Sequence, residues 1–87
     1  MDTLSFRMPL VIFARRPSQV VLISTVAQGL AFLVNRAQQE DNFHWRAALE
    51  SCRIAQIGRG TTTAARSTLV AAIRKAGMWV DVKLGAV

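Results

Sequence analysis

The N-terminal part of this 87-residue chain alternates apolar and other residues so regularly that it constrains the fold more than any other feature. Every even position from Leu4 to Ile12 is apolar, and Ser5, Arg7 and Pro9 fall between them. A period of two predicts a strand with one buried face. Because Pro9 has no N–H to donate to a neighbouring strand, we expect this strand to lie at the edge of a sheet or to carry a bulge there.

The residues after this strand predict a hairpin and then a helix. Residues 15–18 have the composition of a turn, and the β-branched segment Gln19–Ile23 predicts a second strand. Thr25 and Gln28 have the spacing of a capping box, which opens a helix. Gly29 inside this helix is compatible with close packing of its backbone. The predicted apolar stripe of the helix comprises Ala27, Leu30, Ala31, Val34 and Ala37.

Two more helices and a last strand follow. Asn42 and Thr61–Thr63 are expected to cap the helices at their N-termini, and Gly58 and Gly77 are expected to end them. Alternation returns in Met78–Leu84 and predicts a short strand. The order ββαααβ predicts an α+β fold in which three helices pack on one face of a small antiparallel sheet. The predicted buried stripes of the two helices are Trp45, Ala48, Leu49, Cys52 and Ala55, and Ala65, Leu69, Ala72, Ile73 and Ala76.

The composition fits a single domain over residues 1–87, with short disordered ends. A hydrophobic content of 52% is too high for a disordered chain, and 87 residues are too few for two separate cores. One cysteine excludes an internal disulfide framework. Asp2 and Pro9 make the start of the chain a poor signal peptide. The longest apolar stretch, Val20–Val34, is shorter than the roughly 20 residues that a membrane helix needs. We therefore expect a cytoplasmic protein with no membrane partner.

Several short segments resemble one known family. They are Met8-Pro9-Leu10, Ser24-Thr25, Trp45-Arg46-Ala47-Ala48-Leu49, Cys52, Gly58, Ala65-Arg66 and Ala71-Ala72-Ile73-Arg74-Lys75-Ala76-Gly77. Together they resemble the small bacterial family catalogued as domain of unknown function 982. Such sequences often end the first helix with Trp-Pro, where this chain has Ala37-Gln38. The resemblance supports the outline of the fold and implies no activity, substrate or cofactor.

The sequence lacks the groups of residues that catalysis and metal binding require. A nucleophile must lie within hydrogen-bond reach of its base. The only thiol, Cys52, and the only imidazole, His44, are about 12 Å apart along one predicted helix, which rises about 1.5 Å per residue. Metal sites need three or four suitable ligands close together, and no such cluster is visible. We expect no enzyme activity, metal or cofactor, with Cys52 in the core and His44 near the surface.

The segment Gly58–Thr63 is the most suggestive local motif. A glycine-rich loop that leads into a helix N-terminus can bind an anion, and Gly58, Gly60 and Thr61 are the candidate residues. Phosphate loops, however, follow a strand and end in Gly-Lys-Ser or Gly-Lys-Thr. A glycine that ends one helix and a threonine that caps the next explain the same residues. An anion-binding protein or enzyme built on this loop is therefore the most distant alternative.

A strongly basic balance suggests a second kind of partner. Eleven Lys and Arg against five Asp and Glu give a net charge of +6, which favours nucleic acids or acidic proteins. If the hairpin turn and the start of the third helix face the same way, four arginines would form one patch for phosphates. These arginines are Arg15, Arg16, Arg59 and Arg66.

Apolar residues expected on outer strand faces suggest a protein partner instead. Val11, Phe13 and Trp79 would form an exposed apolar surface, with Val11 and Phe13 on an edge strand. Such a surface favours a homodimer or recruitment of another protein. We therefore expect a non-enzymatic binding or accessory domain for protein interaction or self-association, with nucleic-acid binding as the alternative.

Overall fold

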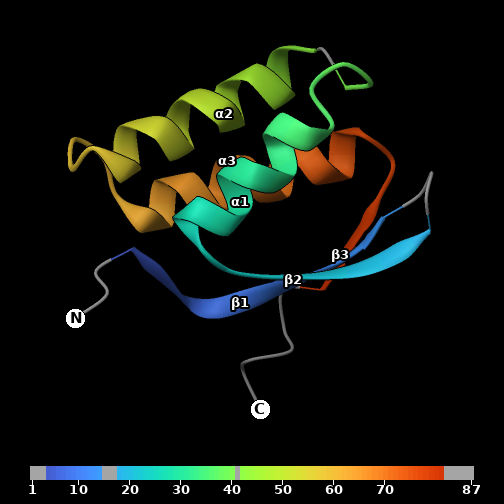
Figure 1. Cartoon of the computed structure of the whole chain (residues 1–87), viewed down its shortest axis with the longest axis horizontal. Coiled ribbons are helices and arrows are strands. Elements are labelled where there is room, and N and C mark those ends of the chain that lie inside the picture. Colours follow the sequence, from blue (N-terminus) through green and yellow to red (C-terminus); the bar gives the residue numbers. More distant parts are fainter. Residues whose placement is uncertain (1–3, 15–17, 41, 82–87) are drawn as a thin grey trace.

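A computed structural model of the chain describes residues 4–14, 18–40 and 42–81. Its element order confirms the predicted α+β fold with ββαααβ topology (Figure 1). The elements are β1 (Ser5–Ala14), β2 (Gln19–Thr25), α1 (Val26–Asn35), α2 (Phe43–Gln56), α3 (Thr62–Lys75) and β3 (Trp79–Asp81). Most of the predicted turn at 15–18, both chain ends and the predicted extension of the last strand to Leu84 lie outside the described residues.

The three strands form one antiparallel sheet with the order β2-β1-β3. The prediction that β1 lies at the edge is therefore wrong, because β3 pairs with Val11–Phe13 along the side of β1 that faces away from β2. The alternative prediction of a bulge near Pro9 is confirmed. The register between β1 and β2 shifts between Ser5 and Leu10, where Pro9 lacks an N–H for the ladder.

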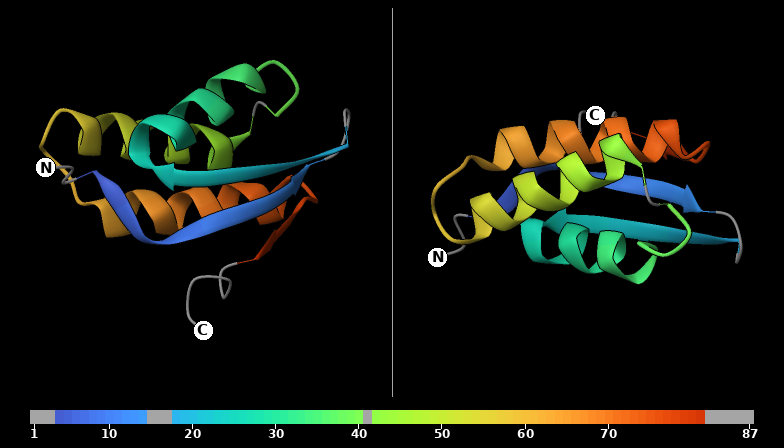
Figure 2. Two further views of the ribbon diagram at one scale, coloured as in Figure 1. Left: turned by 60° about the horizontal axis from the view of Figure 1, so that its bottom comes forward. Right: turned by 90° about the horizontal axis from the view of Figure 1, so that it is seen from above.

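All three helices lie on one side of this sheet, so the protein has one helical layer and one β layer (Figures 1 and 2). The core fills the space between them. Leu10, Ile12 and Ile23 reach it from the sheet, and Leu69 and Ile73 reach it from α3. Among the described residues, no helix is long and apolar enough to cross a membrane.

Trp45, in the first turn of α2, joins this helix to the last turn of α1. Its side chain is only 1% exposed, and its indole Nε1–H donates a hydrogen bond of 2.9 Å to the carbonyl oxygen of Leu33. The ring of Phe32 lies 6.1 Å from the Trp45 ring, and the guanidinium of Arg36 lies 5.4 Å from the centre of the Phe32 ring. A buried tryptophan with a satisfied N–H therefore fixes how the two helices pack.

The predicted stripes of α2 and α3 are confirmed, but the predicted stripe of α1 is wrong. Ala27, Ala31 and Val34 are exposed, and the buried residues of α1 are Val26, Gly29, Phe32 and Leu33. The physical reason is Gly29, where an added Cβ would lie 3.0 Å from Leu69 Cδ2 and 3.6 Å from Ile23 Cγ2. The backbone of α1 packs against the core at this glycine, so most of the predicted stripe faces solvent.

The predicted N-terminal caps are present. Side-chain oxygens of Thr25, Asn42 and Thr61 accept hydrogen bonds from the backbone N–H groups of Gln28, Trp45 and Ala64. The capping box at Thr25 differs in one bond, because the Gln28 side chain accepts from Ser24 N–H at 2.7 Å and not from the N–H of the cap residue.

Candidate interaction surface

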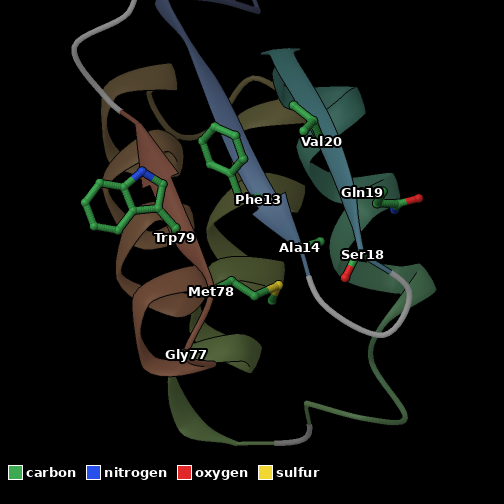
Figure 3. Close-up of a pocket in the computed structure, with 8 residues that line it drawn as sticks. All are labelled: Phe13, Ala14, Ser18, Gln19, Val20, Gly77, Met78 and Trp79. Carbon is green, nitrogen blue, oxygen red and sulfur yellow. The ribbon is translucent and has the colours of Figure 1, made fainter.

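The sheet face that points away from the helices carries large apolar side chains. In the antiparallel register Phe13 lies opposite Trp79 on β3 and opposite Val20 on β2. Figure 3 shows these three side chains in one row across the sheet. In the neighbouring row Val11 lies opposite Leu22 and Asp81. We call five of these residues the outer apolar face: Val11, Phe13, Val20, Leu22 and Trp79.

Most of the outer apolar face is open to solvent. The exposed fraction is 42% for Phe13, 65% for Val20, 57% for Leu22 and 69% for Trp79, and Val11 is half-buried. Contiguous exposed apolar patches above a few hundred Å² mark interaction sites on small soluble proteins. A large side chain has an area of about 150–250 Å² when it is fully exposed. The exposed fractions above therefore give the outer apolar face an area of roughly 400 Å².

The strands that build this face are apolar on both sides. Residues 10–14 of β1 and 20–23 of β2 are continuous apolar runs, in which alternate side chains point to the helices and to the outer face. A strand with one solvated face normally alternates apolar and polar residues, whereas continuous apolar runs are typical of strands covered on both faces. The helices cover one face of this sheet only (Figure 2).

Charge is distributed unequally between the two layers. Five basic side chains of the helical layer are exposed: Arg46, Arg53, Arg59, Arg74 and Lys75. Among the outer-face side chains that the structure describes, none is basic, and Asp81 is acidic. The five residues of the outer apolar face therefore repel a positively charged partner less than the exposed basic side chains of the helical layer do.

A hollow of about 580 Å³ lies at the end of the outer apolar face near the hairpin. Phe13, Val20 and Trp79 line it together with Gly77 and Met78 (Figure 3). The hollow thus extends the row Trp79–Phe13–Val20 and offers space beside it for an inserted side chain.

The structure brings Val11, Phe13 and Trp79, the predicted interaction residues, onto one face. They lie on the central strand and on β3, and β1 is not the predicted edge strand. Sequence reasoning missed Val20 and Leu22. A signal was present, because a hairpin that turns at residues 15–18 pairs Phe13 with Val20 and Val11 with Leu22.

The predicted arginine patch stays a prediction, because Arg15 and Arg16 lie outside the described residues. In Figure 1 the end of β1 and the start of β2 lie at the opposite end of the molecule from the loop between α2 and α3, which carries Arg59. The described ends of the hairpin strands and the start of α3 therefore do not face one common side.

Arg66 lies instead beside a groove between α3 and the first half of β1. Its Nε–H donates a 3.0 Å hydrogen bond to the carbonyl oxygen of Met8. The groove has a volume of about 620 Å³, and Phe6, Val70 and Arg74 line it as well. This hydrogen bond links α3 to β1, two elements that are far apart in the sequence.

Each candidate residue of the Gly58–Thr63 loop has a structural role. Gly58 has a φ of +82°, and its N–H donates to the carbonyl oxygen of Ala55 at 3.1 Å, as expected for a glycine that ends a helix. A Cβ on Gly60 would lie 2.9 Å from Ile54 Cγ2. Thr61 caps α3 with its hydroxyl oxygen. These contacts support the reading of the loop as a helix end followed by a helix cap.

Cys52 and His44 both lie in α2 and do not meet. Cys52 is fully buried, and burial raises the pKa of its thiol to about 11, so the nucleophilic thiolate is disfavoured. The ring of His44 is half-buried and packs edge-on against Phe43 at 5.4 Å. No group of three or more His, Cys, Asp or Glu side chains that could hold a metal ion occurs within residues 4–14, 18–40 and 42–81.

Comparison with known proteins finds one family. The family described as "Protein of unknown function (DUF982)" matches residues 8–80. No curated protein and no solved structure matches the chain.

Proposed function

We propose that this chain, which belongs to the DUF982 family of proteins of unknown function, is a non-enzymatic interaction domain that binds another protein surface through its outer apolar face. The proposal includes a cytoplasmic location, where such a domain would meet its partner. The helical layer and the core serve as the scaffold that holds the three strands in register.

One observation carries the proposal: β1 and β2 are apolar on both faces over residues 10–14 and 20–23, and the helices cover only one of these faces. Apolar surface that stays exposed to water contributes nothing to the stability of the folded monomer. Covering roughly 400 Å² of it contributes on the order of 10 kcal/mol at about 25 cal/mol per Å². That gain is comparable to the entropic cost of association, estimated at about 4–15 kcal/mol, before the partner's own buried surface is counted. A partner that fits the face can therefore bind.

The arrangement of charges and rings supports a protein partner over a nucleic acid. Proteins that bind single strands combine exposed aromatic rings with basic side chains along one groove. Here Phe13 and Trp79 lie on the β layer, whereas the exposed basic side chains that the structure describes lie on the helical layer. Binding to mixed DNA and RNA that falls steeply with salt and is unchanged in a Trp79→Ser variant would favour the nucleic-acid alternative.

Photo-cross-linking in the native cell tests the proposal. A photoreactive amino acid replaces Leu22 on the outer apolar face in one variant and Ala64, an exposed residue of α3, in a matched variant. We expect protein adducts from position 22 and few from position 64. A second substitution, Trp79→Ser, should remove the adducts at position 22.

The control for this second substitution is Phe43→Ser. Phe43 is an aromatic residue of α2 that is 73% exposed, so its loss removes a similar apolar surface from the other layer. Adducts at position 22 should persist in this variant. Equal adducts from positions 22 and 64, or adducts at 22 that survive Trp79→Ser, would refute the proposed use of the outer apolar face.

A further inference from the structure

We infer that the partner of the outer apolar face is a second copy of this chain, packed sheet against sheet in a two-fold symmetric dimer. The inference rests on the proposed function and adds the identity of the partner to it. Charge, shape and area on the outer face each bear on it.

Charge restricts how two copies can meet. Each copy carries a net charge of +6, so two copies repel each other at long range. The exposed basic side chains of the helical layer would face each other if the helices formed the contact. The five residues of the outer apolar face are uncharged, and Asp81, opposite Val11, is acidic. Close approach of two like-charged copies is therefore less costly through this face than through the helical layer.

The face is also complementary to itself. Its largest side chain, Trp79, lies on one outer strand, the smaller Val20 lies on the other, and Phe13 lies between them. A two-fold axis that runs along β1 between two stacked sheets exchanges the two outer strands. It places Trp79 of each copy over Val20 of the other and brings the two Phe13 rings together. A large side chain thus meets a small one twice, as an isologous interface requires.

The hollow beside the row leaves room for an inserted tryptophan. Val20 is one of the residues that line the hollow, so a Trp79 ring placed over Val20 of the second copy would lie next to this space. Stacked sheets pack about 10 Å apart with interdigitated side chains, which suits such an insertion. Figure 3 shows the wall residue Val20 and the ring of Trp79 on opposite sides of Phe13.

The area of the face is small for a stable dimer. A stable interface of standard size covers about 800 Å² on each partner. The outer apolar face supplies roughly half of that at its centre, from side chains of about 150–250 Å² for the aromatic residues. We therefore expect a dimer that dissociates in the micromolar range, with Trp79 as its main contact. Replacing Trp79 by serine should raise the dissociation constant on the order of tenfold or more.

Variants that each add one cysteine to the chain test this geometry with a short bis-maleimide cross-linker. In Phe13→Cys, the new thiol lies next to the two-fold axis and should link to the same residue of the second copy. Leu22→Cys and Val20→Cys lie on β2, far from their own symmetry mates, and should not link to themselves. A mixture of Val20→Cys with Trp79→Cys chains should link, because the axis brings these positions together. The unmodified chain, whose Cys52 is buried, is the blank.

Each alternative outcome overturns the inference in a distinct way. Self-linking of Val20→Cys or Leu22→Cys without self-linking of Phe13→Cys would show that two β2 edges pair instead of two faces. No linking in any variant, for chains that sediment as monomers at all concentrations, would exclude the dimer. In that case photo-adducts at position 22 that depend on Trp79 would still support the proposed function with a different protein, and their absence would refute both.

Discussion

At the scale of single residues, Trp45 couples the two helices that follow the hairpin. Replacing it by phenylalanine removes the N–H that bonds to the Leu33 carbonyl oxygen and part of a fully buried ring. That oxygen keeps the N–H of Arg36 as a donor at 3.3 Å, so the group is not left without a partner. We expect Trp45→Phe to lower the free energy of unfolding by about 1–3 kcal/mol in urea denaturation.

The matched change for this experiment is Phe43→Leu in the same helix. Phe43 is 73% exposed, so we expect a change within about 0.5 kcal/mol. If the two variants lost the same stability, the buried indole would have no special role in the helical layer.

Cys52 gives a pH-dependent prediction. Its pKa is raised by burial from 9.0 to about 11, so the neutral thiol is favoured in the folded state. Below pH 9 the thiol is protonated in both states and stability does not depend on it. As pH rises from 9 to 11, the thiol ionises in the unfolded chain first, and stability falls. Unfolding free energies across this range should show a steeper decline for the natural chain than for Cys52→Ala, and equal slopes would contradict the assignment.

At the scale of elements, substitutions in the α2–α3 loop distinguish a structural role of this loop from an anion-binding role. Gly58 adopts a φ of +82°, which costs a residue with a Cβ about 1–2 kcal/mol. We expect Gly58→Ala to destabilise the protein by about 1 kcal/mol and Gly58→Asn by less, because asparagine tolerates this conformation. The measurement is urea denaturation of the three proteins.

The same experiment with added phosphate separates the two readings of the loop. If the loop has only a structural role, added phosphate should change the stability of the natural chain and of Gly58→Ala by the same amount. A chloride solution of equal ionic strength is the control. A stabilisation specific to phosphate that Gly58→Ala loses would indicate an anion site in the loop.

Elements whose pattern depends on local chemistry were predictable from the sequence. The caps at Thr25, Asn42 and Thr61 are local hydrogen bonds, and the stripes of α2 and α3 follow from period and polarity alone. The buried face of α1 was not predictable in this way, because all sides of this helix carry apolar residues and the deciding contact is Gly29 against Leu69, which is distant in sequence. Tertiary packing overrode the periodic pattern there.

The candidate surface was likewise predictable from the sequence only in part. Sequence alternation placed Val11, Phe13 and Trp79 on outer strand faces, but the central position of β1 depends on β3, which returns to the sheet only after three helices. The hairpin register would have added Val20 and Leu22. The separation of charge between the two layers depends on how the helices cover the sheet, and no local pattern encodes it.

At the scale of the whole molecule, the described part of the chain combines a layer of three helices with a sheet that these helices cover on one face only. In the proposed dimer, the exposed basic side chains of the helical layer would disfavour contact through the helices. The described part of the outer face, with four large side chains that are 42–69% exposed, would form the contact. The unequal distribution of charge and apolar surface thus supports the proposed association through the outer apolar face.

Sedimentation equilibrium over a wide concentration range tests this use most directly. For the natural chain and for Phe43→Ser, the weight-average mass should rise from the monomer value of 9.6 kDa towards twice that value as concentration increases. Trp79→Ser should remain monomeric over the concentrations at which the natural chain associates. The same mass for all three proteins at every concentration would contradict association through the outer apolar face.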